Sequence, residues 1–301
     1  MSIELTGSVK ERRNTSTTDI DRLSTQDMLK IISQEDSRIN HAIAQCLPEI
    51  TRLVDNASAA LSRGGRVVLV GAGNSGRNAM LAALSFSQSD NNNQVIGMIA
   101  GGALAMMHEL DSAARDYDRG ALDLQVIGFN EHDMLVAVTV NGKTPWVWGA
   151  MRHARQLGAT VAVVTCDAQS ESAQLADIVI APDTGAEVVA GYGNPKAESA
   201  QKQILHMLTT GLVIRSGRTY GNLRVDIQPT EPRWTERQVA LVMEACNCPR
   251  AQAKVALESC NNHCKTAIVM ILTGLDAWRA HDLLNQNSGY VRMALQEAPR
   301  G

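Results

Sequence analysis

The chain has 301 residues, of which 45% are hydrophobic and 20% charged, and its formal net charge is −3 at pH 7. These values favour a packed globular protein over a disordered one, and the lack of a basic block argues against a nucleic-acid partner. No apolar run reaches the roughly 18 residues of a membrane span, and the N-terminal stretch lacks a signal-peptide core. The six cysteines are scattered and do not form the pattern of a disulfide framework. We therefore expect a cytoplasmic protein with no membrane partner.

The first elements in chain order are helices. Ser24, followed three residues later by Asp27, resembles a capping box at the start of a helix. Apolar residues recur at helical spacing from about residue 37 to residue 61, and Pro48 is expected to kink or interrupt this helix.

Strands and helices then alternate. A β-branched run at 66–70 predicts a buried parallel strand, and similar runs at 94–100, 134–140, 160–165 and 178–181 predict four more. Helical patterns follow the first three strands, through residue 86, at 103–115 and at 145–157, and a long one covers 196–214. This alternation predicts an α/β fold with a doubly wound parallel sheet.

Beyond Pro229 and Pro232 the sequence shows no strand pattern, and residues 235–298 predict three or four short helices. We therefore expect two domains, an α/β domain over 1–234 and a small helical domain over 235–301.

Two strand-end loops carry the candidate anion site. The first strand runs through glycines into a helix, which leaves backbone N–H groups available to a phosphate. Asn74 and Ser75 add side-chain donors to this loop, and Asn141-Gly142-Lys143-Thr144-Pro145 forms a second loop before a helix. The second loop alone is equally typical of an ordinary strand–helix turn, but the pair predicts convergence on one anion.

Two other interpretations are weaker. Gly71-x-Gly73-x-x-Gly76 matches a dinucleotide fingerprint, but Asp90 precedes the second strand instead of ending it. Cys246, Cys248, Cys260 and the His263-Cys264 pair carry metal-ligand atoms, but their spacing is better explained by helix packing. We therefore expect a phosphosugar or another small phosphate ligand, with no cofactor and no metal.

With these motifs in view, the chain resembles the N-acetylmuramic acid 6-phosphate etherase family of sugar-isomerase (SIS) fold proteins. The matching segments are 13–25, 71–77, 99–102, 141–145, 184–191, 196–202, 221–226 and 264–270. The resemblance implies an SIS-type sheet, a small helical C-terminal module and a homodimer with the sugar site at the subunit interface. The glucokinase regulatory protein is a related, non-enzymatic user of the same fold.

The resemblance also implies a chemistry. Members of the family cleave the D-lactyl ether of an open-chain sugar phosphate, with two glutamates as acid and base. The position of the first glutamate matches Ser85 and that of the second matches Ala114, so neither holds a carboxylate. Glu109 and Asp111, within about one helical turn of Ala114, are candidate substitutes.

The phosphate side matches the family better, because Ser75, Gly76, Arg77, Thr144, Glu187 and Lys196 are retained. Three positions nevertheless differ. Asn141, Lys143 and Ala103 stand where the family has serine, arginine and glutamate. The residues expected to bind the ligand are Gly73, Asn74, Ser75, Gly76, Arg77, Asn141, Gly142, Thr144, Glu187 and Lys196.

We therefore expect a protein that binds a 6-phosphorylated amino sugar, either N-acetylmuramic acid 6-phosphate or a relative. We expect weak or no catalysis and a sensor or regulator role, in which a protein partner would read the bound state. The alternatives are a functional etherase with substitute acid and base residues, or another phosphosugar reaction.

Overall fold

The computed structural model describes residues 13–87, 93–227 and 232–299. The chain divides into two compact units between Thr209 and Thr210, and each is described by itself. Apart from Ser87, the described residues up to Thr209 form the α/β unit, and those from Thr210 onward belong to the helical unit. None of the helices in these residues is long and apolar enough to cross a membrane.

The N-terminal helices begin and break close to the expected residues. After two short 3-10 turns, η2 (Thr15–Thr17) and η3 (Ile20–Arg22), helix α1 spans Thr25–Gln45 and helix α2 spans Leu47–Ser62. The Ser24 hydroxyl accepts a hydrogen bond from the Asp27 N–H, as the capping pattern predicts. The helix is interrupted at Cys46, and Pro48 lies in the first turn of α2, where its missing N–H leaves no bond unmade.

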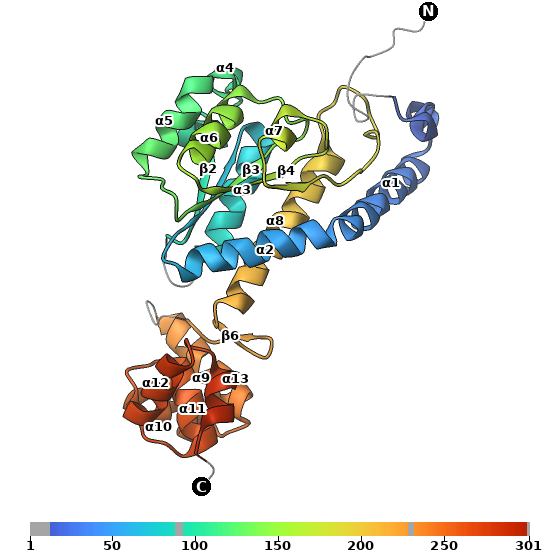
Figure 1. The fold of residues 1–301 in the computed structure, drawn as a ribbon. Helices are drawn as coiled ribbons and strands as arrows, with labels where there is room; N and C mark the ends of the chain where they lie inside the picture. The colour runs from blue at the N-terminus through green and yellow to red at the C-terminus, as the bar shows by residue number, and fades with distance from the viewer. Residues whose placement is uncertain (1–12, 88–92, 228–231, 300–301) are drawn as a thin grey trace, which may run out of the picture. The chain divides into compact units, whose positions relative to one another are not determined.

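A parallel sheet of five strands forms the centre of the α/β unit (Figure 1). Its strands are β1 (Val67–Gly71), β2 (Val95–Ile99), β3 (Met134–Val138), β4 (Thr160–Val164) and β5 (Ile178–Ile180), in the order β2-β1-β3-β4-β5. Every residue of β1 and β3 is buried, because helices cover both faces of the sheet. The predicted doubly wound α/β fold is confirmed.

Helices connect these strands. They are α3 (Gly73–Ser87), α4 (Asp111–Arg115), α5 (Tyr117–Val126), α6 (Pro145–Gln156), α7 (Glu171–Gln174) and α8 (Pro195–Arg215), with a 3-10 turn η4 at Gly102–Met106. The single helix expected over 103–115 is wrong. The Arg77 guanidinium binds the carbonyl oxygens of Ala105, Met106 and His108, which a continuous helix would need for its own hydrogen bonds.

The helical unit contains five helices within residues 232–299, where three or four were expected. They are α9 (Pro232–Cys246), α10 (Arg250–Ser259), α11 (Cys264–Thr273), α12 (Ala277–Gln286) and α13 (Val291–Glu297). A hairpin of β6 (Thr219–Tyr220) and β7 (Leu223–Arg224) precedes them, and Val225 belongs to their core. The compact-unit division therefore falls upstream of the expected domain limit at 234, and the limit itself stays a prediction.

The cysteines of this unit pack into its core. Burial raises the pKa of both Cys246 and Cys264 to about 12, which keeps these thiols protonated near neutral pH. Nowhere in the described residues do three or more His, Cys, Asp or Glu side chains form a group that could hold a metal ion.

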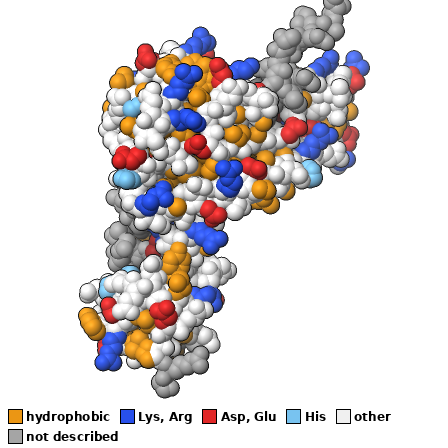
Figure 2. All heavy atoms as spheres, viewed as in Figure 1, with side chains coloured by type: hydrophobic (Ala, Val, Ile, Leu, Met, Phe, Trp, Pro, Cys, Tyr) orange, Lys and Arg blue, Asp and Glu red, His pale blue; other side chains and the backbone are white. Residues whose placement is uncertain are grey.

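The surface agrees with the modest net charge. On the face that Figure 2 shows, Lys and Arg side chains are interspersed with Asp and Glu side chains and do not gather into one basic stripe.

Candidate functional site

The strand order places a topological switch point between β1 and β3. From β1 the chain crosses to β2 on one side, whereas β3 leads to β4 on the other. Ligands of open α/β sheets bind at such a switch point, outside the carboxyl ends of the strands. Gly71 at the end of β1 is the register partner of Val138 at the end of β3. Residues 71–76 and 139–144, here called the switch-point site, therefore follow neighbouring strand ends.

The glycine loop is shaped by close packing. A Cβ at Gly76 would lie 2.6 Å from the Ile99 Cγ1 atom and 2.7 Å from the Gly71 carbonyl oxygen. Gly73 begins α3 with a φ of +53°, and Ser75 is buried in the first turn. The first N–H groups of a helix have no partner within it, so this turn presents donors at the switch point.

Two side chains of this loop already have partners. The Asn74 amide donates to both carboxylate oxygens of Glu198, each at 3.1 Å, and its carbonyl oxygen accepts from Arg77 at 2.7 Å. The remaining Arg77 bonds hold the segment after β2, as described above. The structure shows Arg77 supporting the neighbouring segment, and its expected role in ligand binding stays a prediction.

The second loop is fixed by its own hydrogen bonds. The Asn141 side chain accepts from the Lys143 N–H at 3.1 Å, and a Cβ at Gly142 would lie 2.1 Å from the Ser170 Oγ atom. The Thr144 hydroxyl lies 3.2 Å from the Thr139 hydroxyl and makes no capping bond to α6. Thr144 is thus placed at the start of α6, with its hydroxyl beside that of Thr139.

Glu187 and Lys196 lie together, but in a buried network. The Glu187 carboxylate accepts the backbone N–H groups of Lys196 at 3.0 Å and Ala197 at 3.2 Å, and so caps α8. The Lys196 ammonium donates to the Glu35 carboxylate at 2.8 Å and to the Ala186 carbonyl oxygen at 2.9 Å. These contacts hold the start of α8 against α1.

No sequence motif pointed to Glu35 as the partner of Lys196. Burial acts to raise its pKa, but the hydrogen bonds from Lys196 and Asn14 outweigh burial and leave the pKa of Glu35 below its ordinary value. The pair is separated by 161 residues, and no local pattern marks it.

The two positions matched to the family glutamates offer no acid. The Ser85 hydroxyl donates to the Leu81 carbonyl oxygen at 2.8 Å, and Ser85 lines a hollow of about 130 Å³ together with Lys202 and His206. Ala114 lies in α4, and the nearby carboxylates of Glu109 and Asp111 are exposed.

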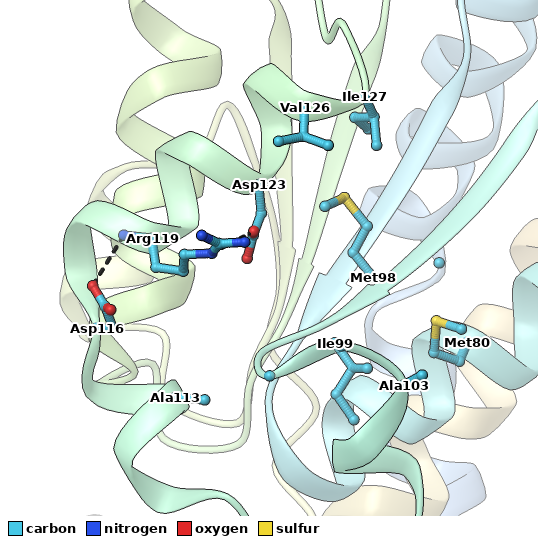
Figure 3. A pocket seen from close by; sticks show the side chains of 13 residues that line it. Met80, Met98, Ile99, Ala103, Ala113, Asp116, Arg119, Asp123, Val126 and Ile127 are labelled. Carbon is cyan, nitrogen blue, oxygen red and sulfur yellow. Dashed lines mark hydrogen bonds and ion pairs between the residues drawn. The ribbon is translucent and has the colours of Figure 1, made fainter.

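Another hollow lies along the outer edge of β2 (Figure 3). It measures about 560 Å³ and is lined mainly by glycines and apolar side chains. The α5 wall adds Asp116 and an ion pair between Arg119 and Asp123 at 2.8 Å. Of the described residues that line it, none is a predicted phosphate ligand.

Comparison with known proteins identifies the family. Residues 47–155 match the family model of the glucokinase regulatory protein N-terminal SIS domain. N-acetylmuramic acid 6-phosphate etherases from Klebsiella aerogenes and Photobacterium profundum are 46% and 45% identical over 297 residues, covering 98% of this chain and 99% of each relative. The fold is similar to a phosphoheptose isomerase from Francisella tularensis, with a TM-score of 0.51 at 18% identity over 63% of this chain and 98% of that one. The chain therefore belongs to the N-acetylmuramic acid 6-phosphate etherase family.

Proposed function

We propose that the protein binds a 6-phosphorylated amino sugar, N-acetylmuramic acid 6-phosphate or a relative, and does not cleave its ether at an ordinary enzymatic rate. Binding is supported by the etherase relatives and by the donors of the switch-point site. In this proposal the phosphate accepts from the first N–H groups of α3 and from the hydroxyls of Ser75 and Thr144. Asn141 and Gly142 shape the second side of the site.

One observation carries the second half of the proposal, namely the absence of a carboxyl group at Ser85 and at Ala114. Ether elimination needs one group to remove the acidic C2 proton and another to protonate the departing lactate. Loss of one general acid or base typically costs about 10²–10⁴ in rate, and here both are replaced.

The protein then acts as a cytoplasmic sensor or regulator, and a protein partner binds in response to the bound sugar phosphate.

The proposal also includes a homodimer. Its support is the apolar surface of α3 and α8, where Leu81, Leu84 and Met207 are 49%, 61% and 37% exposed. A second copy is the partner that this surface fits best in a family whose sugar site lies between subunits.

A working etherase is the second candidate. The two relatives with this name favour it, as does the presence of Glu109 and Asp111 near Ala114. In this case one of these carboxylates would replace the missing acid or base.

Two measurements made together distinguish binding without cleavage from a working etherase. Calorimetric titration with N-acetylmuramic acid 6-phosphate is combined with a lactate-release assay, in which the Klebsiella aerogenes relative is the positive control. We expect binding without lactate above background. Lactate release at an ordinary rate, abolished by Asp111→Ala or Glu109→Ala, would establish the second candidate and contradict the first. Lack of any binding would contradict both.

A further inference from the structure

Glu198 places a carboxylate beside the switch-point site. The phosphate-binding role proposed for the two loops does not account for a negative charge at this place. The Asn74 amide donates to both of its carboxylate oxygens at 3.1 Å, and the Asn78 amide donates to its backbone carbonyl oxygen at 3.0 Å. These two asparagines lie one turn apart on α3, so Glu198 is held from two points. Its side chain is only partly exposed to solvent.

The Glu198 carboxylate forms no ion pair within the described residues. Arg77 reaches only as far as the carbonyl oxygen of Asn74, and Lys196, two positions before Glu198, is paired with Glu35. A phosphate that enters the switch-point site therefore meets a negative charge nearby and an Asn74 amide that is already occupied. For a bare anion, both effects reduce affinity.

A phosphate monoester of a sugar carries hydroxyl groups away from its charge, whereas the hydroxyl groups of inorganic phosphate belong to the anion itself. An ionised carboxylate can only accept hydrogen bonds, and a sugar hydroxyl can donate one. Glu198 can thus exchange its bonds from Asn74 for bonds from hydroxyl groups of the ligand, and Asn74 then becomes free to donate to the phosphate.

We infer that Glu198 is the specificity-determining residue of the switch-point site. It disfavours inorganic phosphate and selects phosphate monoesters that carry hydroxyl groups. This inference rests on the proposed function, because it assumes that the phosphate binds at residues 71–76 and 139–144.

The test uses the full chain and two variants of Glu198. Glu198→Gln removes the charge but keeps an oxygen that can accept from Asn74, and Glu198→Ala removes both. Glu131→Gln is the matched control, since Glu131 is exposed and precedes β3 at the opposite end of the sheet. Each protein is titrated with inorganic phosphate and with N-acetylglucosamine 6-phosphate at one pH and one ionic strength, and circular dichroism confirms the fold.

We expect Glu198→Gln to bind inorganic phosphate more tightly than the wild-type protein, because the variant removes a unit negative charge beside the site. Affinity for the sugar phosphate should rise less or fall. The dissociation constant for inorganic phosphate divided by that for the sugar phosphate should therefore drop. Glu198→Ala should lower the ratio further, and Glu131→Gln should leave it unchanged.

An unchanged ratio in both Glu198 variants, with the sugar phosphate still bound, would overturn the role of Glu198 and leave the proposed function standing. An equal change in Glu131→Gln would also overturn it, because the effect would then be one of net charge. If neither the wild-type protein nor any variant binds either ligand, the proposed function fails as well.

Discussion

Ser75 and Lys196 both belong to motifs of the family, yet their surroundings differ. Ser75 is buried in the first turn of α3, at the switch point between β1 and β3, whereas Lys196 is buried against Glu35 and the Ala186 carbonyl oxygen. At the residue scale, the motifs of the family therefore contain both residues at a helix start beside β1 and residues that hold the fold.

For Ser75 we expect an effect on binding. Ser75→Ala removes one donor to the phosphate and should weaken sugar phosphate binding by about 1.5–3 kcal/mol, the range for hydrogen bonds to charged groups. Isothermal titration calorimetry measures this loss. Ser62→Ala is the control, because the exposed Ser62 bonds only to the Ser58 carbonyl oxygen of its own helix. Equal affinity of Ser75→Ala and wild type would reduce the glycine loop to a structural turn.

For Lys196 we expect an effect on stability. Lys196→Met leaves the Glu35 carboxylate buried without its main partner, which should lower the free energy of unfolding by about 3–5 kcal/mol. Lys202→Met, on the same helix but exposed, should change it by less than about 1 kcal/mol. Urea unfolding of the two variants gives the comparison. Similar stabilities would show that the Lys196–Glu35 pair contributes little.

At the scale of elements, the sequence predicts the strands well and the long-range contacts poorly. Buried runs such as 134–138 are visible because parallel strands are apolar on both faces. Helix α5 was missed because its sequence, YDRGALDLQV, is polar and contains a glycine. The glycine Gly120 lies there because a Cβ would meet the Trp146 carbonyl oxygen at 2.0 Å, a contact that no local pattern reveals.

Only part of the candidate site could be predicted from the sequence. The two strand-end loops were predictable as strand–helix connections, because each follows an apolar run and carries asparagine, glycine and hydroxyl residues. The partners of Lys196, Asn74 and Arg77 were not, because Glu35, Glu198 and the 105–108 carbonyl groups lie far from them in sequence. Whether the predicted ligand residues bind the sugar stays a prediction.

The start of α3 should be intolerant of a methyl group. Gly76→Ala places a Cβ against the Gly71 carbonyl oxygen and Ile99, so strand and helix must move apart. We expect a stability loss of about 1–3 kcal/mol, or more, with loss of sugar phosphate binding. Gly158→Ala is the control: Gly158 has a φ of +80° with open space around it, so only backbone strain of about 1–2 kcal/mol applies and binding should persist. Wild-type affinity in Gly76→Ala would contradict this account.

At the scale of the whole molecule, the free energy of unfolding should depend on pH, because the ionisation of buried carboxylates contributes to it. Burial acts to raise the pKa of Asp133, but hydrogen bonds from the Arg66 side chain and from two backbone N–H groups outweigh it and lower that pKa. A carboxylate with a lowered folded-state pKa stabilises the fold above its ordinary pKa, and this contribution is lost as pH falls through the folded-state value.

Asp133→Asn tests this sign. The variant should be less stable than wild type at pH 7, and the difference should narrow as the pH falls below about 4, the ordinary range of an aspartate. Unfolding curves at a series of pH values measure the difference. A difference that stays constant down to the acid transition would show that the ionised form of Asp133 adds no stability.

The proposed homodimer gives the second prediction at this scale. Leu84→Asp puts a charge on the exposed apolar surface of α3, so it should shift the protein from dimer to monomer in analytical ultracentrifugation. Val255→Asp, which changes a residue 62% exposed on α10, should leave the dimer intact. A wild-type protein that sediments as a monomer at micromolar concentration would contradict the dimer directly.

The hydrogen bond of Ser85 to its own helix has a consequence for how well this position tolerates substitution. Ser85 is exposed, and its hydroxyl bonds only within α3 among the described residues, whereas Glu187 and Lys196 are buried and hold the start of α8. Position 85 should therefore accept side chains of different size and polarity with little change in folding stability, whereas positions 187 and 196 should not.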